Sequence, residues 1–167
     1  ASQTFTIDVT PVSDAPTLTT ISDFNGGVED TLYTISMAQL ATNADEADVD
    51  GDPISYLVAN LVSGTLTIGG NPVIPGTTVF NANDLEWTPA SNANGLLNAF
   101  ELLAFGGVLC SSTLEMVRVN VAPVNDAPVL INGPYTFDDI DEDDVTNTGD
   151  EIEIDTAMVS DPDGPDA

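Results

Sequence analysis

The sequence predicts an all-β protein made of antiparallel β-sandwich repeats of about seven strands each, joined end to end. Short apolar runs are separated by turn signals rich in Gly, Pro and Asn, at a spacing of roughly 8–12 residues. The segment Pro-Val-Ser-Asp-Ala-Pro at 11–16 returns as Pro-Val-Asn-Asp-Ala-Pro at 123–128, an offset of 123 − 11 = 112 residues. A motif that recurs at this distance indicates tandem domains, and each unit is large enough to bury its own core.

Acidic landmarks return at nearly the same period. The pair Glu-Asp at 29–30 reappears at 142–143, and Asp-Val-Asp-Gly at 48–51 is matched by Asp-Pro-Asp-Gly at 161–164, both with an offset of 113 residues. The repeat predicts three parts. Residues 1–13 are the closing strand of a preceding repeat with its linker, residues 14–125 form a complete β-sandwich repeat, and residues 126–167 begin the next, incomplete repeat.

The first element expected is a half-buried strand at 4–12. Phe5, Ile7 and Val9 alternate with polar residues, as the side chains of a strand with one buried face do. The closing strand of the complete repeat has a similar pattern in Val117, Val119 and Val121. The prolines at both ends of the 11–16 segment lack an N–H donor, so they end the strand and keep the linker extended.

Within the complete repeat, residues 17–21 and 31–35 are expected to be the first two strands, with a turn at 24–27 between them. Leu32 and Ile35 are candidates for burial in the second strand. Residues 37–44 favour a single helical turn, and residues 45–53 form an acidic loop. Further strands are expected at 54–62, 65–68, 79–80, 85–87, 96–105 and 114–121, with a hairpin turn at 69–72.

Aromatic residues supply the expected anchors of the core. Trp87, Phe100 and Phe80 lie in the predicted strands and should be buried there. An exposed Trp87 that stacks on a ligand is the alternative interpretation. Cys110 is the single cysteine, so no disulfide can form within the chain, and the residue is expected to be a small buried hydrophobe.

The charge of the chain excludes several classes of partner. There are 28 acidic residues against one base, Arg118, and neither Lys nor His occurs. Such a surface repels nucleic acid and anionic lipid, so we expect no nucleic-acid partner and no direct insertion into a membrane. Two explanations of the acidity remain open. One is the specific binding of divalent cations, and the other is a general adaptation to a salty environment.

The acidic loops have the composition of a calcium site. Calcium takes six to eight oxygen ligands from carboxylates, carbonyls and water. Asp48, Asp50 and Asp52 alternate along one loop, and the intervening Gly51 permits the backbone to curl so that the carboxylates converge. Asp161 and Asp163 repeat the arrangement beside a stiffening proline. Because the pattern repeats in register with other oxygen-rich positions, the sequence predicts Ca²⁺ as the cofactor.

Several motifs together resemble a known family. These are Pro-Val-Asn-Asp-Ala-Pro, Glu-Asp-Thr at 29–31, Asp-x-Asp-Gly-Asp at 48–52, Trp-Thr-Pro at 87–89 with Gly95 six residues later, and a closing Val-x-Val strand. In this combination the chain resembles the cadherin-like, bacterial Ig-like tandem repeats of large bacterial surface adhesins of the repeats-in-toxin type. The resemblance covers essentially the whole chain and implies a rod in which calcium lies at the domain junctions.

The resemblance also implies the ligands at each junction. At the first junction, Asp14 of the linker would join the acidic loop of the complete repeat. At the second, the linker, the base of the complete repeat and the next acidic loop would converge. The residues implied at the second junction are Asn125, Asp126, Glu29, Asp161 and Asp163, and Glu142 is the counterpart of Glu29 in the next repeat.

The chain departs from the family pattern in a few places. Ser13 stands where the second linker has an Asn, and the segment 95–100 lacks the Asp that many such repeats carry there.

The function expected from these features is that of a non-enzymatic repeat at the cell surface or outside the cell. Its partners would be neighbouring repeats of the same polypeptide or identical subunits, completed by strand donation. A carbohydrate- or ice-binding Ig-like module is the alternative. An enzyme is the least favoured class, because carboxylate pairs are the only candidate acid–base groups and no His or Lys could activate a nucleophile.

Overall fold

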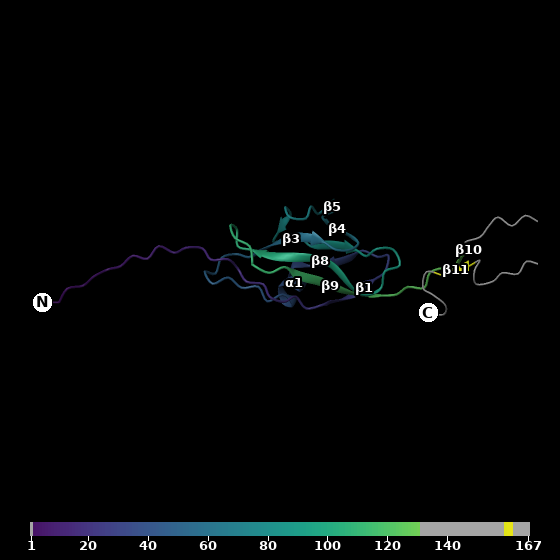
Figure 1. Cartoon of the computed structure of the whole chain (residues 1–167), viewed down its shortest axis with the longest axis horizontal. Coiled ribbons are helices and arrows are strands. Elements are labelled where there is room, and N and C mark those ends of the chain that lie inside the picture. The colour runs from purple at the N-terminus through teal and green to yellow at the C-terminus, as the bar shows by residue number, and fades with distance from the viewer. Residues whose placement is uncertain (1, 131–158, 162–167) are drawn as a thin grey trace, which may run out of the picture. The chain divides into compact units, whose positions relative to one another are not determined.

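The computed structural model describes residues 2–130 and 159–161 of the 167-residue chain. The chain divides into two compact units, Ala1–Pro123 and Val124–Ala167 (Figure 1). In the second unit, β10 (Val129–Leu130) pairs antiparallel with β11 (Val159–Ser160). The predicted metal ligands Glu142 and Asp163, together with most of the next repeat's expected elements, lie outside the described residues.

The first unit is mostly β-sheet, which confirms the predicted all-β class. One short helix, α1 (Met37–Asn43), follows the second strand. The strands of this unit are β1 (Phe24–Val28), β2 (Tyr33–Ile35), β3 (Ser55–Leu61), β4 (Thr65–Ile68), β5 (Asn71–Pro72), β6 (Val79–Phe80), β7 (Leu85–Thr88), β8 (Gly95–Phe105) and β9 (Glu115–Ala122).

The larger sheet contains five strands in the order β1-β9-β8-β3-β6. The pairs β9–β8, β8–β3 and β3–β6 are antiparallel, but β1 runs parallel to β9. The expectation of a wholly antiparallel fold is therefore wrong at this edge. The long chain between β1 and β9 passes through both sheets, so no tight hairpin fixes their relative direction.

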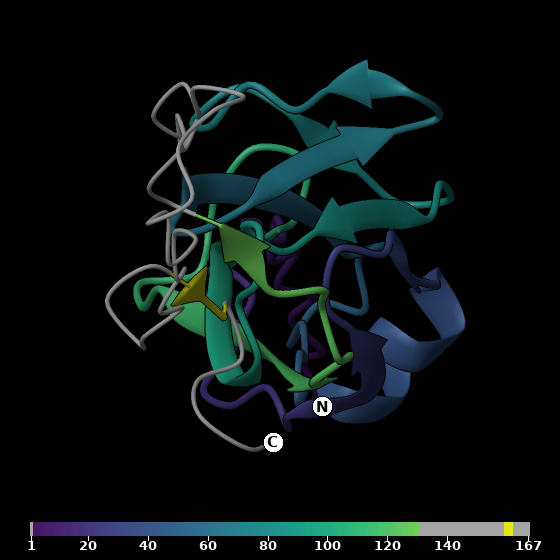
Figure 2. The same ribbon diagram turned by 90° about the vertical axis from the view of Figure 1, so that its right-hand side faces the viewer.

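The smaller sheet contains four strands in the order β2-β7-β4-β5 and is antiparallel throughout. β4 and β5 are joined at Gly69 and Gly70, both of which have positive φ, so the hairpin expected at 69–72 is present. In Figure 2 the helix α1 lies at the edge of the strands.

Side chains from both sheets meet in one hydrophobic core. Trp87 of β7 and Phe100 of β8 are fully buried, and Phe80 of β6 is stacked on Tyr56 of β3 with ring centroids 5.7 Å apart. The indole Nε1–H of Trp87 donates to the carbonyl oxygen of Ser63 at 2.8 Å, so the one polar atom of the ring is satisfied. The three predicted core anchors are confirmed, and the fold is sandwich-like.

The segment predicted as a turn at 24–27 is instead strand β1. Gly26 has φ of +97° and marks a register shift between Asn25 and Gly27 in the pairing with β9. At Gly27 an added Cβ would lie 3.0 Å from a methyl carbon of Val119. The two glycines therefore permit a β-bulge and a close approach to β9, and neither reverses the chain.

The strand expected at 4–12 does not form. Its residues are in no strand, and Phe5, Ile7 and Val9 are each more than four-fifths exposed. Alternation makes a segment suitable for a sheet, but a strand also needs a hydrogen-bonded neighbour, and none of the strands in the described part of the chain pairs with it.

Residues 17–21 also form no regular strand. They are held to residues 44–52, which we call the acidic segment, by isolated bridges from Thr17 to Ala47 and from Ile21 to Ala44. Leu32 is 52 % exposed, whereas Ile35 is buried as expected. Cys110 is only half-buried, whereas the apolar run before it predicted a buried residue.

The helix α1 begins with a capping box. Ser36 Oγ accepts from the backbone N–H of Gln39, while the side-chain oxygen of Gln39 accepts from the N–H of Ser36 at 2.9 Å. Leu40 is the buried residue that docks the helix. The helical turn predicted at 37–44 is confirmed. No helix within residues 2–130 and 159–161 combines the length and apolar character that crossing a membrane requires.

We predict that replacing Trp87 with Ala destabilises the fold strongly. Removal of a fully buried Trp leaves a cavity, and the expected loss in the free energy of unfolding is about 3–5 kcal/mol. The measurement is urea unfolding followed by circular dichroism. Phe5→Ala, which alters an exposed aromatic residue, is the control and should leave the midpoint unchanged. Equal midpoints for the two variants would contradict the assignment of the core.

Candidate metal centre

The acidic segment is fixed against residues 17–22 by backbone hydrogen bonds. Thr17 N–H donates to the carbonyl of Ala47 at 2.8 Å, and Ala47 N–H donates back to Thr17 at 3.0 Å. Ser22 N–H donates to the carbonyl of Asn43 at 2.8 Å. This pairing holds residues 44–47 extended, so the loop that follows starts from a defined position.

Asp45 stabilises this pairing through its carboxylate. It accepts hydrogen bonds from the Thr19 hydroxyl, from the Thr19 N–H at 2.8 Å and from the Thr20 N–H at 2.9 Å. The hydrogen bond from the Thr19 side chain, followed by those from the two backbone N–H groups, lowers the pKa of Asp45. The charged carboxylate therefore serves as the acceptor that connects the two segments.

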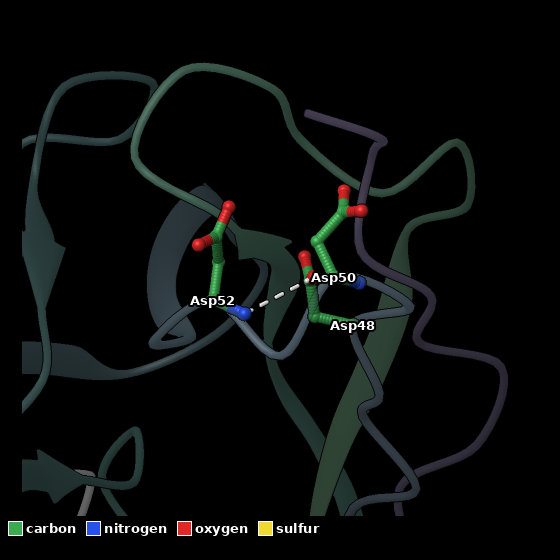
Figure 3. A group of neighbouring side chains, drawn as sticks. All are labelled: Asp48, Asp50 and Asp52. Carbon is green, nitrogen blue, oxygen red and sulfur yellow. Dashed lines mark hydrogen bonds between the residues drawn. The ribbon is translucent and has the colours of Figure 1, made fainter. Parts of the chain in front are cut away.

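Asp48 organises the acidic loop. Its Oδ1 accepts from the backbone N–H of Asp50 at 2.9 Å and from that of Asp52 at 3.2 Å (Figure 3). Gly51, which has φ of +76°, allows the backbone to curl between these two donors. A carboxylate can accept from N–H groups two and four residues later only if the backbone makes a tight turn. The curl at Gly51 that the sequence predicted is therefore present.

The loop brings three carboxylates together. One carboxylate oxygen from each of Asp48, Asp50 and Asp52 lies within 4.8 Å of the other two, and all three side chains project from the same loop (Figure 3). Asp50 and Asp52 are exposed, and Asp48 is half-buried. This cluster, which we call the acidic cluster, could hold a metal ion through its carboxylate oxygens.

The linker also reaches the acidic cluster. The backbone N–H of Asp14 donates to Oδ2 of Asp50 at 2.8 Å, and the Ser13 hydroxyl donates to Oδ2 of Asp52 at 3.3 Å. The structure therefore brings the backbone of Asp14 to Asp50, and the role of the Asp14 carboxylate as a metal ligand stays a prediction. The contact made by Asp14 is through its backbone N–H.

Arg118, the only base in the sequence, is engaged in another contact. Its Nε lies 2.7 Å from Oδ1 of Asp23, and both side chains are partly exposed. No Lys or second Arg exists to neutralise the acidic cluster. Three carboxylates at this spacing repel one another, so the cluster must attract cations from solution.

Sequence analysis missed Glu46. Its Oε2 is buried and has no hydrogen-bond partner among the described residues, and the same is true of Asp48 Oδ2 and the Tyr56 hydroxyl. Glu46 precedes Asp48 by two residues in an extended segment, so the two side chains point to the same side. The spacing of two residues between Glu46 and Asp48 was the signal in the sequence that could have identified Glu46. The Asp-x-Asp-Gly motif begins at Asp48 and therefore does not include it.

Glu29 lies at the other end of the five-stranded sheet. It follows β1, its N–H donates to the carbonyl of Ala122 at the end of β9, and its Oε2 accepts from the amide of Asn94 at 3.0 Å. It is 1 % exposed. Because β8 and β9 are antiparallel, this end is opposite to Gly106, which follows β8 and lies beside Asp48. The structure therefore does not bring Glu29 to the acidic cluster.

The ligands predicted for the second junction remain a prediction. Asn125, Asp126 and Asp161 belong to the second unit, where the Asn125 amide donates to the carbonyl of Asp126 at 2.9 Å. Glu142 and Asp163 lie outside the described residues. Trp87 is fully buried and offers no stacking surface, so the alternative interpretation of this residue is wrong.

Comparison with known proteins adds no relative from which residues could be assigned. No protein-family model matches the chain, and no curated protein matches it. The candidate metal centre is therefore inferred from the geometry of its own residues.

We predict that Asp45→Asn lowers stability at neutral pH and that the loss becomes smaller in acid. The folded pKa lies below the unfolded value of about 3.9. The charged form therefore stabilises the fold above that value, and this contribution declines as pH falls below about 4. The measurement is urea unfolding at pH about 7 and about 3. Asp8→Asn, at an exposed position, is the charge-matched control. A difference between wild type and Asp45→Asn that is constant with pH would contradict the role of Asp45.

Proposed function

We propose that the chain is a non-enzymatic, extracellular structural or adhesive repeat. It would form a rod-like segment of a surface adhesin or filament, stiffened by calcium at the junctions between domains. The observation that carries this proposal is the contact between the linker and the acidic cluster. Asp14 and Ser13 donate to two of the three clustered carboxylates, so an ion held there would fix the linker to the domain.

The positions at which the chain enters and leaves the first unit support an end-to-end array. The linker enters beside the acidic cluster, next to Gly106 at one end of the five-stranded sheet. β9 ends at Ala122, beside Glu29 at the opposite end, and leads directly into the second linker at 123–128. A domain with opposite entry and exit points adds length when it is repeated. The two sheets around one core fit the Ig-like, cadherin-like sandwich that the motifs suggest.

Calcium is the cation that suits this site best. The available ligands are carboxylates and carbonyls on a curled loop, and calcium accepts irregular arrangements of six to eight oxygens. Magnesium demands a near-ideal octahedron and keeps more of its water. Extracellular modules bind calcium with Kd of about 10⁻⁴–10⁻³ M. A site of that strength would be filled outside the cell, which is consistent with the proposed location.

We predict that calcium raises the melting temperature of the protein by binding to a specific site, and not through ionic strength. At free calcium of about 100 times Kd, binding to the folded state adds roughly 2.7 kcal/mol to stability. The measurement compares thermal melts in EDTA, in calcium, in magnesium and in sodium chloride of matched ionic strength. The double variant Asp50→Asn, Asp52→Asn should lose the calcium increment, while Asp8→Asn keeps it. Equal melts in all four buffers would contradict the metal site and favour general salt adaptation.

Strand donation is the proposed mode of association with identical subunits. Phe5, Ile7 and Val9 alternate in an exposed segment that has no sheet neighbour among the described strands, which makes the segment suitable for completing another sheet. We predict that the mass measured by light scattering rises with concentration for the wild type and not for Ile7→Asp. Thr6→Asp, on the other side of the segment, is the matched control. A monomer at all concentrations would contradict donation between subunits.

A further inference from the structure

Asn94 is followed directly by Gly95, and an asparagine in this position can react with its own backbone. The backbone nitrogen of the following residue attacks the side-chain amide carbon of the asparagine, and glycine hinders this approach least because it has no Cβ. The sequence contains three Asn-Gly pairs, at 25–26, 94–95 and 132–133. The third lies outside the described residues, so the structure permits a comparison of the first two.

The two described Asn-Gly pairs differ in how firmly the backbone is held. Asn25 lies inside β1, opposite Asn120 of β9, and its carbonyl oxygen accepts from the Tyr33 hydroxyl at 2.8 Å. Asn94 is exposed in the loop before β8, and Gly95 is the first residue of that strand. A Cβ added at Gly95 would meet nothing within 4 Å. The loop before β8 therefore has room for a ring to close, whereas strand pairing holds Asn25 in place.

The side-chain amide of Asn94 stabilises a buried charge. Its Nδ2 donates to Oε2 of Glu29 at 3.0 Å, and Glu29 is 1 % exposed. A carboxylate that is removed from water needs such donors. The N–H of Glu29 donates to the carbonyl of Ala122 at the end of β9, and Gly95 pairs with Val121 of the same strand. Asn94 therefore lies at the end of the five-stranded sheet where the chain continues into the second linker.

We propose that Asn94 is a site of spontaneous deamidation. The nitrogen of Gly95 forms a bond to Cγ of Asn94, the bond between Cγ and Nδ2 breaks, and the amide nitrogen leaves as ammonia with the proton from Gly95. Water then opens the succinimide ring. Opening at Cγ gives aspartate, and opening at the backbone carbonyl carbon gives isoaspartate, in which the main chain runs through Cβ and Cγ.

Both products change the contact with Glu29. An ionised carboxylate has acceptors and no donor, so the hydrogen bond to Glu29 is lost and a second negative charge takes its place. Like charges beside each other at a buried site are unfavourable. Isoaspartate also lengthens the main chain directly before β8. The modification therefore weakens the end of the domain that leads into the second linker, and it accumulates irreversibly as the protein ages.

The first measurement is peptide mass spectrometry of the full chain after ageing in mildly alkaline buffer. Deamidation is detected from the mass increase that accompanies replacement of the amide NH₂ by OH. We expect Asn94 to convert faster than Asn25 in the folded protein and at a similar rate in urea, where strand pairing is lost. Asn71 is the internal control, because Pro72 follows it and has no backbone N–H. Slower or equal conversion of Asn94 in the folded protein would overturn the proposal.

The second measurement tests the consequence for Glu29 through urea unfolding. Asn94→Asp, which reproduces one product, should lower the midpoint, whereas Asn81→Asp makes the same charge change at an exposed position and should leave it nearly unchanged. Asn94→Gln keeps an amide and cyclises far more slowly, so it should prevent most of the loss of stability that wild type shows on ageing. Equal midpoints for the two Asp variants, or an equal loss on ageing in Asn94→Gln, would contradict the proposal.

Discussion

The chain has 28 acidic residues and a single basic residue, an arginine. Most of the hydrogen bonds that its carboxylates accept must therefore come from donors that are not basic side chains. Backbone N–H groups take that role at several points. Asp45 accepts from the N–H groups of residues 19 and 20. Asp48 accepts from those of residues 50 and 52, and Asp50 accepts from that of residue 14. These contacts give the acidic segment its shape, join it to the linker and leave charge that only a cation from solution can neutralise.

The core and the acidic segment depend on each other through the end of the five-stranded sheet. Tyr56 belongs to the core through its stacking on Phe80, and its hydroxyl faces the carboxylate of Glu46. Gly106, directly after β8, leaves room for Pro16 and for Asp48. Binding of an ion at this end would therefore act on the sheet, the linker and the loop together. Under the proposed function, that connection would couple calcium binding to the stiffness of a junction.

The sequence predicted the parts of the fold that local patterns determine. The strands of the core and the buried Trp87 follow from alternation and aromatic content, and the helical turn follows from the helical character of residues 37–44. It failed where a glycine pair serves a bulge in β1, because composition does not separate a bulge from a turn. It also failed at residues 4–12, where alternation gives no information on the presence of a neighbouring strand. At the candidate site it identified the clustered aspartates and missed Glu46, whose burial depends on tertiary packing.

The central claim is that a specific calcium ion neutralises the acidic cluster. Equilibrium dialysis with calcium in a large excess of sodium tests it most directly, because sodium screens diffuse charge and leaves a specific site available. The account predicts saturable calcium binding that magnesium displaces poorly and that the double variant Asp50→Asn, Asp52→Asn weakens. Calcium accumulation that never saturates, or that sodium abolishes in wild type and variant alike, would contradict it and assign the acidity to general solvation of the surface.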